Sequence, residues 1–324
     1  DMPVPGYDTD TVNTLRLFSA RSTHEFDPDY FLHGDYLLAC EDKLRAESIT
    51  KVLYPRDDSP KGKELRLQQE YLLVSASLQD ILARFRLQNQ DWELLPERAA
   101  IQLNETHPVL AIPELMRLLM DREGLGWKQA WEITTRTFAY TNHSVMPEAL
   151  EKWPVPLMGK LLPRHLEIIY EINARLLDSV YRLHPGDFDR LGRMSLIEEG
   201  EEPKVRMAHL GVVGSHSVNG VSALHTQILK ARVLRDFHEF YPDRFNNKTN
   251  GITPRRWLKK ANAPLASLIT EAIGEAWVTD LDQLRQLAPL AEDPELQSRW
   301  RGVKRLNKDR LAAYLRRAQG AALD

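Results

Sequence analysis

A short strand-like run, a tip of hydrogen-bonding side chains and a helical pattern follow one another four times along this chain. The four runs are Ala99–Leu103, Thr137–Tyr140, Met207–Val213 and Arg244–Lys248. Short strands that alternate with helices are typical of a largely parallel sheet, and ligands bind outside the carboxyl ends of such strands. The pattern therefore predicts an α/β fold in which all four polar tips lie at one edge of the sheet.

The tips are rich in amides, hydroxyls and imidazoles. These groups donate and accept hydrogen bonds without bringing charge, which suits an uncharged, polyhydroxylated ligand such as a sugar. A phosphate group would call for Arg, Lys or a glycine nest. Taken singly, each Asn or Ser can instead cap the helix that follows it, and each His can be a packed core side chain. The tip residues are Asn104, Glu105, Thr106 and His107; Thr141, Asn142, His143 and Ser144; Ser215, His216, Ser217 and Asn219; and Thr249 and Asn250.

Other kinds of active site find less support in the sequence. Glu105 and His107 could be two metal ligands, but the HExxH spacing is absent, and we predict no metal site. No nucleophile elbow, phosphate loop or dinucleotide fingerprint occurs. A glycosidase would need two carboxylates that face each other. The sequence leaves that possibility open, with Glu105, Asp57 and Asp58 as acids in loop positions.

Helical patterns account for much of the remaining chain. Apolar residues at three- and four-residue spacing predict helices over Tyr36–Tyr54, Glu64–Phe85 and Arg164–His184, and their apolar faces are expected to be core. Arg56–Gly62 is rich in turn residues and is predicted to be a loop. The helices expected after the four tips are Pro113–Asp121, Glu148–Trp153, Val221–Leu229 and Arg255–Ala261.

Composition narrows the class of protein. At 324 residues the chain suits about two domains. A net charge of −3 provides no basic face for nucleic acid, and no apolar run approaches the roughly 20 residues of a membrane span. The single cysteine, Cys40, excludes an internal disulfide and favours a cytoplasmic protein. The chain lacks an initiator Met and closes in a helical pattern, so we expect it to be the middle of a longer protein.

Several long segments resemble the α-glucan phosphorylase family, which comprises glycogen, starch and maltodextrin phosphorylases. The resemblance runs in order from Val4 to Tyr314 and implies a two-lobed, GT-B-like architecture. Residues 1–252 would be the later part of the N-terminal lobe, and residues 253–324 the truncated start of the C-terminal lobe. The segments that carry the resemblance are "VLYPRDDSPKGKELRLQQEY", "AIQLNETHPVLAIPELMRLL", "AYTNHSVMPEALEKWPV", "RMAHLGVVGSHSVNGVSALHTQIL" and "NKTNGITPRRWL".

The resemblance also implies an activity. Members of the family transfer a terminal glucosyl unit from an α-1,4-glucan to inorganic phosphate, which gives glucose 1-phosphate. Their pyridoxal 5′-phosphate exchanges the proton through its own phosphate group, so we expect no catalytic side chain in this chain. The family's attachment lysine is not in this chain, and only Trp257 falls near the cofactor side. We therefore expect these 324 residues alone to be inactive. The alternative is a non-catalytic, glucan-binding remnant of the same family.

The resemblance assigns substrate-binding roles residue by residue. His143, in "YTNHS", and Asn250, in "KTNG", match residues beside the transferred glucose. Glu105 and His107 match the pocket beyond the anomeric carbon, although the family often has Asp where this chain has Glu105. Val221 matches a residue that lines the glucose pocket.

Two further segments match structural elements whose roles are known in the family. The loop Arg56–Gly62 matches the gate over the catalytic site, with Asp57, Asp58 and Arg66 as its binding residues. Many relatives have Asn-Asp-Asn where this chain has Arg-Asp-Asp, so the inhibitor binding of the family's gate is not expected here. Residues 36–48 match the element that packs against the partner subunit, which predicts a homodimer.

Overall fold

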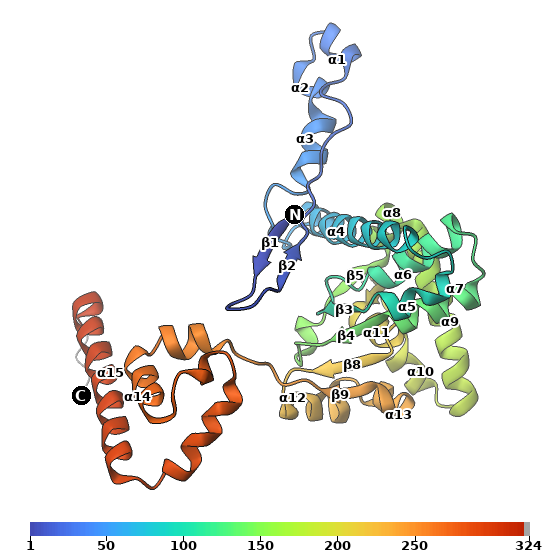
Figure 1. Cartoon of the computed structure of the whole chain (residues 1–324). Helices are drawn as coiled ribbons and strands as arrows, with labels where there is room; N and C mark the ends of the chain where they lie inside the picture. Colours follow the sequence, from blue (N-terminus) through green and yellow to red (C-terminus); the bar gives the residue numbers. More distant parts are fainter. Residues whose placement is uncertain (321–324) are drawn as a thin grey trace. The chain divides into compact units, whose positions relative to one another are not determined.

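A four-stranded parallel sheet forms the centre of the larger part of the chain in the computed structural model (Figure 1). Its strands are β3 (Ile101–Asn104), β4 (Phe138–Thr141), β8 (Ser217–Gly220) and β9 (Phe245–Asn247), in the order β3-β4-β8-β9. Every neighbouring pair is parallel, and the register aligns Asn104 with Thr141 and Thr141 with Asn219. The predicted α/β class with a parallel sheet is confirmed.

The structure describes residues 1–320, which divide into two units. The larger unit is Arg16–Asn250, and the smaller one combines residues 1–15 with the chain from Gly251 onward. Each unit has its own apolar cluster. The predicted boundary after residue 252 lies close to this division, while the assignment of the two parts to lobes stays a prediction.

One predicted strand is wrong. Met207–Val213 forms a helix, α11, and the strand β8 lies in the segment expected to be a polar tip. Six of the seven α11 residues are buried, and a short run that is apolar on every side does not distinguish a helix from a strand by periodicity. As a consequence, Ser215 and His216 precede β8. The His216 backbone N–H donates to the carbonyl of Phe138 at 3.0 Å, which places His216 at the amino end of the sheet.

The predicted helix over Glu148–Trp153 is also wrong. A 3₁₀ turn (Pro147–Ala149) is followed by strand β5 (Lys152–Pro154), which pairs antiparallel with β7 (Lys204–Arg206); β7 also pairs with β6 (Ile197–Glu198). The residue before a proline avoids the α region, so Pro154 favours an extended backbone at Trp153. The Trp153 side chain is buried.

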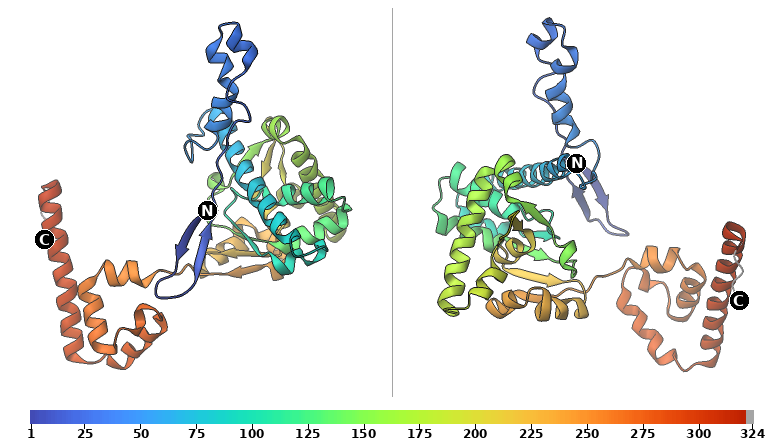
Figure 2. Two further views of the ribbon diagram at one scale, coloured as in Figure 1. Left: turned by 45° about the horizontal axis from the view of Figure 1, so that its top comes forward. Right: turned by 180° about the vertical axis from the view of Figure 1, so that it is seen from behind.

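Two of the three long helical patterns form as predicted. Helix α4 spans Pro60–Arg86, starts at the N-cap Ser59 and buries one stripe of its residues. Helix α9 spans Pro163–Leu183 and ends before Gly186, which has a φ of 85°. Figure 2 shows α4 in light blue and α9 in yellow-green as the longest helices of this unit. Between the strands lie α5 (Leu95–Arg98), α6 (Ala111–Arg117), α7 (Trp127–Thr137), α8 (Val155–Leu161), α10 (Phe188–Met194), α12 (Ala223–Ile228) and α13 (Arg235–Phe240).

The third pattern, Tyr36–Tyr54, is shorter and interrupted. Helix α2 (Tyr36–Ala39) follows α1 (Pro28–Leu32), and α3 (Glu41–Ser48) follows α2 after a break at Cys40. Residues 49–54 leave the helix because three of them are β-branched, which lowers helix propensity, and because Pro55 disfavours helix at Tyr54. Tyr54 has a φ of 55°.

The smaller unit contains a hairpin and a helical part. The hairpin pairs β1 (Met2–Pro5) with β2 (Val12–Leu15). The helical part contains α14 (Ala263–Ile273) and α15 (Pro294–Gln319). A helical turn over Arg255–Lys260 precedes them, as predicted. Trp277 is buried in its apolar cluster, and Gly320 ends α15 in the left-handed conformation. Over residues 1–320, every helix is too short or too polar to cross a bilayer.

Candidate functional site

Side chains at the carboxyl edge of the sheet join three neighbouring strands. The Gln102 amide nitrogen donates to the Thr141 hydroxyl at 2.8 Å, and that hydroxyl donates to the Asn219 amide oxygen at 2.9 Å. The backbone continues the pattern, because the Asn142 N–H donates to the Asn219 carbonyl at 3.0 Å. The parallel register therefore brings the tips of β3, β4 and β8 together, as the sequence predicted.

Glu105 and His143 meet at this edge. The Glu105 Oε2 atom accepts from the His143 backbone N–H at 2.8 Å. Glu105 has a φ of 67°, a conformation that residues other than glycine rarely adopt, and it turns the chain directly after β3. The His143 ring Nε2 faces the Asn104 amide oxygen, which can only accept, so Nε2 carries the proton. The second Glu105 oxygen, Oε1, is buried and has no hydrogen-bond partner in the described part of the chain.

A histidine that the sequence analysis missed stands beside this pair. The Val221 backbone N–H donates to His225 Nδ1 at 3.0 Å, which leaves the ring proton on Nε2. That Nε2 is buried and has no partner among residues 1–320. Burial, together with the nearby His143, lowers the pKa of His225, so its ring is neutral at neutral pH. The Asn250 backbone N–H donates to the Val221 carbonyl at 3.0 Å, which fixes Asn250 to the same edge.

Arg66 connects the predicted gate loop to the tip of β3. Its guanidinium lies 3.7 Å from the Asp57 carboxylate, and one of its nitrogens donates to His107 Nε2 at 3.2 Å. It also stands 5.2 Å from the centre of the Tyr54 ring. Asp58 is exposed, and within the described residues it makes no hydrogen bond or ion pair.

Two glutamates that the sequence analysis did not select lie next to His107. Glu70 belongs to α4 and Glu151 immediately precedes β5. One ligand-capable atom from each of these three side chains lies within 4.8 Å of the others. Burial and the charge of Glu151 raise the pKa of the Glu70 carboxyl far above its ordinary range, and burial also raises the pKa of Glu151. The sequence could not pair the two glutamates, because 81 positions separate them and Glu151 stood in a predicted helix.

Two cavities are lined in part by His107. One of about 330 Å³ is lined by Glu70, Asn104 and His107, among others. Another of about 380 Å³ is lined by Asp57, Arg66, His107 and Glu151. The predicted gate and pocket residues therefore surround accessible space on the larger unit.

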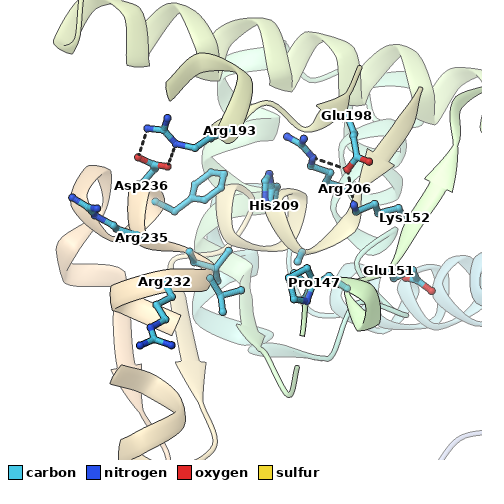
Figure 3. A pocket seen from close by; sticks show the side chains of 15 residues that line it. Pro147, Glu151, Lys152, Arg193, Glu198, Arg206, His209, Arg232, Arg235 and Asp236 are labelled. Carbon is cyan, nitrogen blue, oxygen red and sulfur yellow. Dashed lines mark hydrogen bonds and ion pairs between the residues drawn. The ribbon is translucent and has the colours of Figure 1, made fainter. Parts of the chain in front are cut away.

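A third cavity of about 300 Å³, which shares Glu151 and Lys152 with the second, has charges that are mostly paired (Figure 3). Arg193 forms two bonds with Asp236, and Lys152 and Arg206 both contact Glu198. Burial lowers the pKa of His209 to about 4, so this ring is neutral. Because its charges neutralise one another, this cavity offers a ligand less than the sheet edge does.

Apart from the exposed Asp58, the predicted site residues fall into three groups. Glu105, His143, Val221 and Asn250 lie along the sheet edge, and Asp57, Arg66 and His107 form a chain of contacts beside it. Trp257 belongs to the smaller unit, where its side chain is 63% exposed. Taken together, the edge offers amides, a neutral imidazole N–H and an unpaired carboxylate oxygen, a set suited to binding the hydroxyls of a sugar.

Comparison with known proteins gives the same family as the sequence motifs. The family model described as carbohydrate phosphorylase matches residues 1–324. The brain form of glycogen phosphorylase from Bos taurus is 53% identical over 332 aligned residues, covering 100% of this chain and 39% of the relative. Glycogen phosphorylase from Chlamydia trachomatis is 51% identical, covering 100% of this chain and 40% of the relative. The muscle form from Oryctolagus cuniculus is 53% identical, covering 98% of this chain and 39% of the relative.

Proposed function

Since the chain belongs to the carbohydrate phosphorylase family, we propose that it is part of an α-glucan phosphorylase. The whole protein would transfer a terminal glucosyl unit from glycogen or maltodextrin to inorganic phosphate and release glucose 1-phosphate. The chain spans about 40% of the length of the three relatives described above, each of which is named a glycogen phosphorylase. Its fold is the α/β, GT-B-like architecture of that family.

The observation that carries the proposal is the pair of unpartnered polar atoms at the sheet edge. Glu105 Oε1 is an acceptor and His225 Nε2–H is a donor, and both are buried without a partner in the described residues. A buried polar group left unpaired costs about 1–3 kcal/mol. Sugar hydroxyls both donate and accept, so a bound sugar can supply a partner to either kind of atom. Without a sugar, a water molecule would have to be immobilised at Glu105 Oε1 and another at His225 Nε2, which costs entropy.

We propose that different residues of this pocket contact different parts of the substrate. We assign His143 and Asn250 to the transferred glucose, Glu105 and His107 to the space beyond the anomeric carbon, and Val221 to the wall of the pocket. The Asn104 contact holds the His143 ring in one tautomer, which leaves Nδ1 as a fixed acceptor. Asp57, Asp58 and Arg66 would close over the glucan from the loop side. No side chain of this chain is assigned the proton transfer.

The proposed cofactor of the whole protein is pyridoxal 5′-phosphate, on family grounds. Among the described residues, Trp257 is the residue matched to its side, and it lines none of the cavities above. The residues present therefore do not fit the cofactor by themselves, and we derive no step through it. For the same reason we propose that the 324 residues alone do not carry out phosphorolysis.

We also propose a homodimer that uses α2 and α3, together with a cytoplasmic location. The dimer proposal is supported by the exposure of Tyr36, Leu37 and Leu44, which are 60%, 88% and 63% exposed. Apolar side chains gathered on one exposed segment are typical of protein interfaces. The location is supported by the single cysteine, Cys40.

The proposal is tested with the full-length protein by measuring glucose 1-phosphate release from maltodextrin with and without inorganic phosphate. We expect release to require phosphate, and Glu105→Gln to lower kcat/KM about 10- to 100-fold, because a hydrogen bond to a charged group contributes about 1.5–3 kcal/mol. Glu132→Gln, an exposed carboxylate on α7, is the matched control. A full-length protein that binds maltodextrin but releases no glucose 1-phosphate would instead be the non-catalytic remnant.

A further inference from the structure

We propose that Glu70, His107 and Glu151 form a binding site for a divalent cation of the Zn²⁺ type, which competes with Arg66 for His107. The three ligands come from helix α4, the tip of β3 and the segment before β5. Their ligand atoms lie within 4.8 Å of one another. This inference goes beyond the proposed function and does not depend on it.

The unpartnered glutamate oxygens are the independent observation that points to a cation. The Glu70 side chain is only 8% exposed, and neither of its oxygens has a hydrogen-bond partner in the described part of the chain. Glu151 Oε2 is also buried and has no hydrogen-bond partner among the described residues. Arg66 Nε approaches Glu70 no closer than 3.5 Å. Buried carboxylates are normally paired or coordinate metals, and two beside one imidazole supply three ligands.

The donor set favours Zn²⁺ over the alkaline-earth ions. Imidazole nitrogen suits Zn²⁺, whereas Mg²⁺ and Ca²⁺ prefer an all-oxygen shell. Ligand atoms of a tetrahedral Zn²⁺ site are about 3.3 Å apart, so the three side chains must close by about 1.5 Å at most, which glutamate torsions permit. The cavities beside His107 give the ion a path in and leave room for a water as fourth ligand.

Arg66 and the cation cannot both use His107. A neutral imidazole has one lone pair, and Arg66 donates to it at Nε2 across 3.2 Å. A bound cation takes that lone pair and releases Arg66, whose other ion-pair partners are Glu70 and Asp57. Because Glu70 is itself a ligand of the cation, the released Arg66 can pair only with Asp57, in the loop before α4. Cation binding is thus coupled to the loop, and by linkage the loop affects cation affinity equally.

The test is Co²⁺ and Zn²⁺ titration of the 324-residue chain, with Co²⁺ followed by its visible absorption and Zn²⁺ by equilibrium dialysis. We expect one saturable site per chain. Glu70→Gln and Glu151→Gln should each weaken it at least about 100-fold, the upper range for loss of even an outer-shell partner. Arg66→Gln should tighten it about tenfold, because it removes a competing charge-assisted hydrogen bond. Glu148→Gln, an exposed carboxylate beside Glu151, should leave the affinity unchanged.

The glutamate variants are expected to weaken cation binding, whereas Arg66→Gln is expected to tighten it. Cation binding by other histidines on the surface would not produce these opposite changes in affinity. Equal affinity in the parent chain and in Glu70→Gln would overturn the proposal, as would weaker binding in Arg66→Gln. Absence of saturable binding up to about 1 mM, the limit of a specific site of this kind, would mean that the two glutamates only share a proton. Far-UV circular dichroism checks each variant, and Gln at either position removes a carboxylate ligand with little change in side-chain size.

Discussion

Glu114→Gln is expected to destabilise the larger unit by about 3 kcal/mol at pH 6. Glu114 is fully buried on α6. It accepts from Arg117 Nε at 2.7 Å, from His165 Nε2 at 2.6 Å and from the Ser75 hydroxyl at 2.7 Å. Because Ser75 belongs to α4 and His165 to α9, this one carboxylate connects three helices.

The magnitude follows from the pKa of Glu114. Burial alone would raise the pKa, but the hydrogen bonds from Arg117, His165 and Ser75 outweigh it and lower the pKa from its ordinary 4.5 to about 2. One pKa unit is 1.36 kcal/mol, so the difference contributes about 3 kcal/mol. Since the folded pKa is depressed, this stability is present above pH 4.5 and is lost as the pH falls towards 2. At pH 3 about 1.4 kcal/mol remains.

The assay is urea unfolding of the parent chain and Glu114→Gln at pH 6 and pH 3, followed by far-UV circular dichroism. Glu132→Gln, an exposed carboxylate on α7, is the control and should match the parent chain at both pH values. The gap between the parent and Glu114→Gln should narrow by about half between pH 6 and pH 3. Equal stability at pH 6, or a gap that does not change with pH, would refute the reasoning.

Three further predictions concern the sheet edge and helix α2. Gly220→Ala should cost about 1–3 kcal/mol in urea unfolding, because a Cβ there would lie 2.5 Å from Thr226 Oγ1 and 3.0 Å from the Thr226 backbone, whereas Gly192→Ala meets nothing within 4 Å and should be neutral or stabilising. His225→Ala should weaken maltodextrin binding to the full-length protein about tenfold, the effect of one lost hydrogen bond in calorimetric titration; unchanged binding would remove His225 from the pocket. Leu37→Glu should raise the dissociation constant of the full-length dimer by at least about tenfold in analytical ultracentrifugation, and an unaffected dimer would exclude α2 from the interface.

The parts of the fold that could be predicted are those with a local signal. The runs at β3 and β4 are short, apolar and followed by a polar tip, and α4 has a continuous apolar stripe, so pattern and structure agree there. The sequence of Met207–Val213 has no local signal that distinguishes a helix from a strand. Its burial on every side removes the periodicity that separates a helix from a strand, and the error moved Ser215 and His216 to the opposite end of the sheet.

The candidate site was predictable only where it follows a strand. Glu105 and His143 could be placed together because parallel strands end at one edge. The Glu70–Glu151 pair depends on how α4 packs beside the segment before β5, a tertiary arrangement with no local signature. His225 was missed because it lies inside a helix, where a lone histidine gives no sign of an unpartnered Nε2.

The most direct test of the central claim is hydrogen exchange on the full-length protein with and without maltoheptaose. If the carboxyl edge of the sheet binds the glucan, backbone amides at residues 104–107, 141–144 and 219–225 should exchange more slowly with the sugar bound. Those at residues 214–216, at the amino end of the same sheet, should be unaffected. Protection confined to segments away from the strand ends would contradict the assignment of this edge as the sugar site.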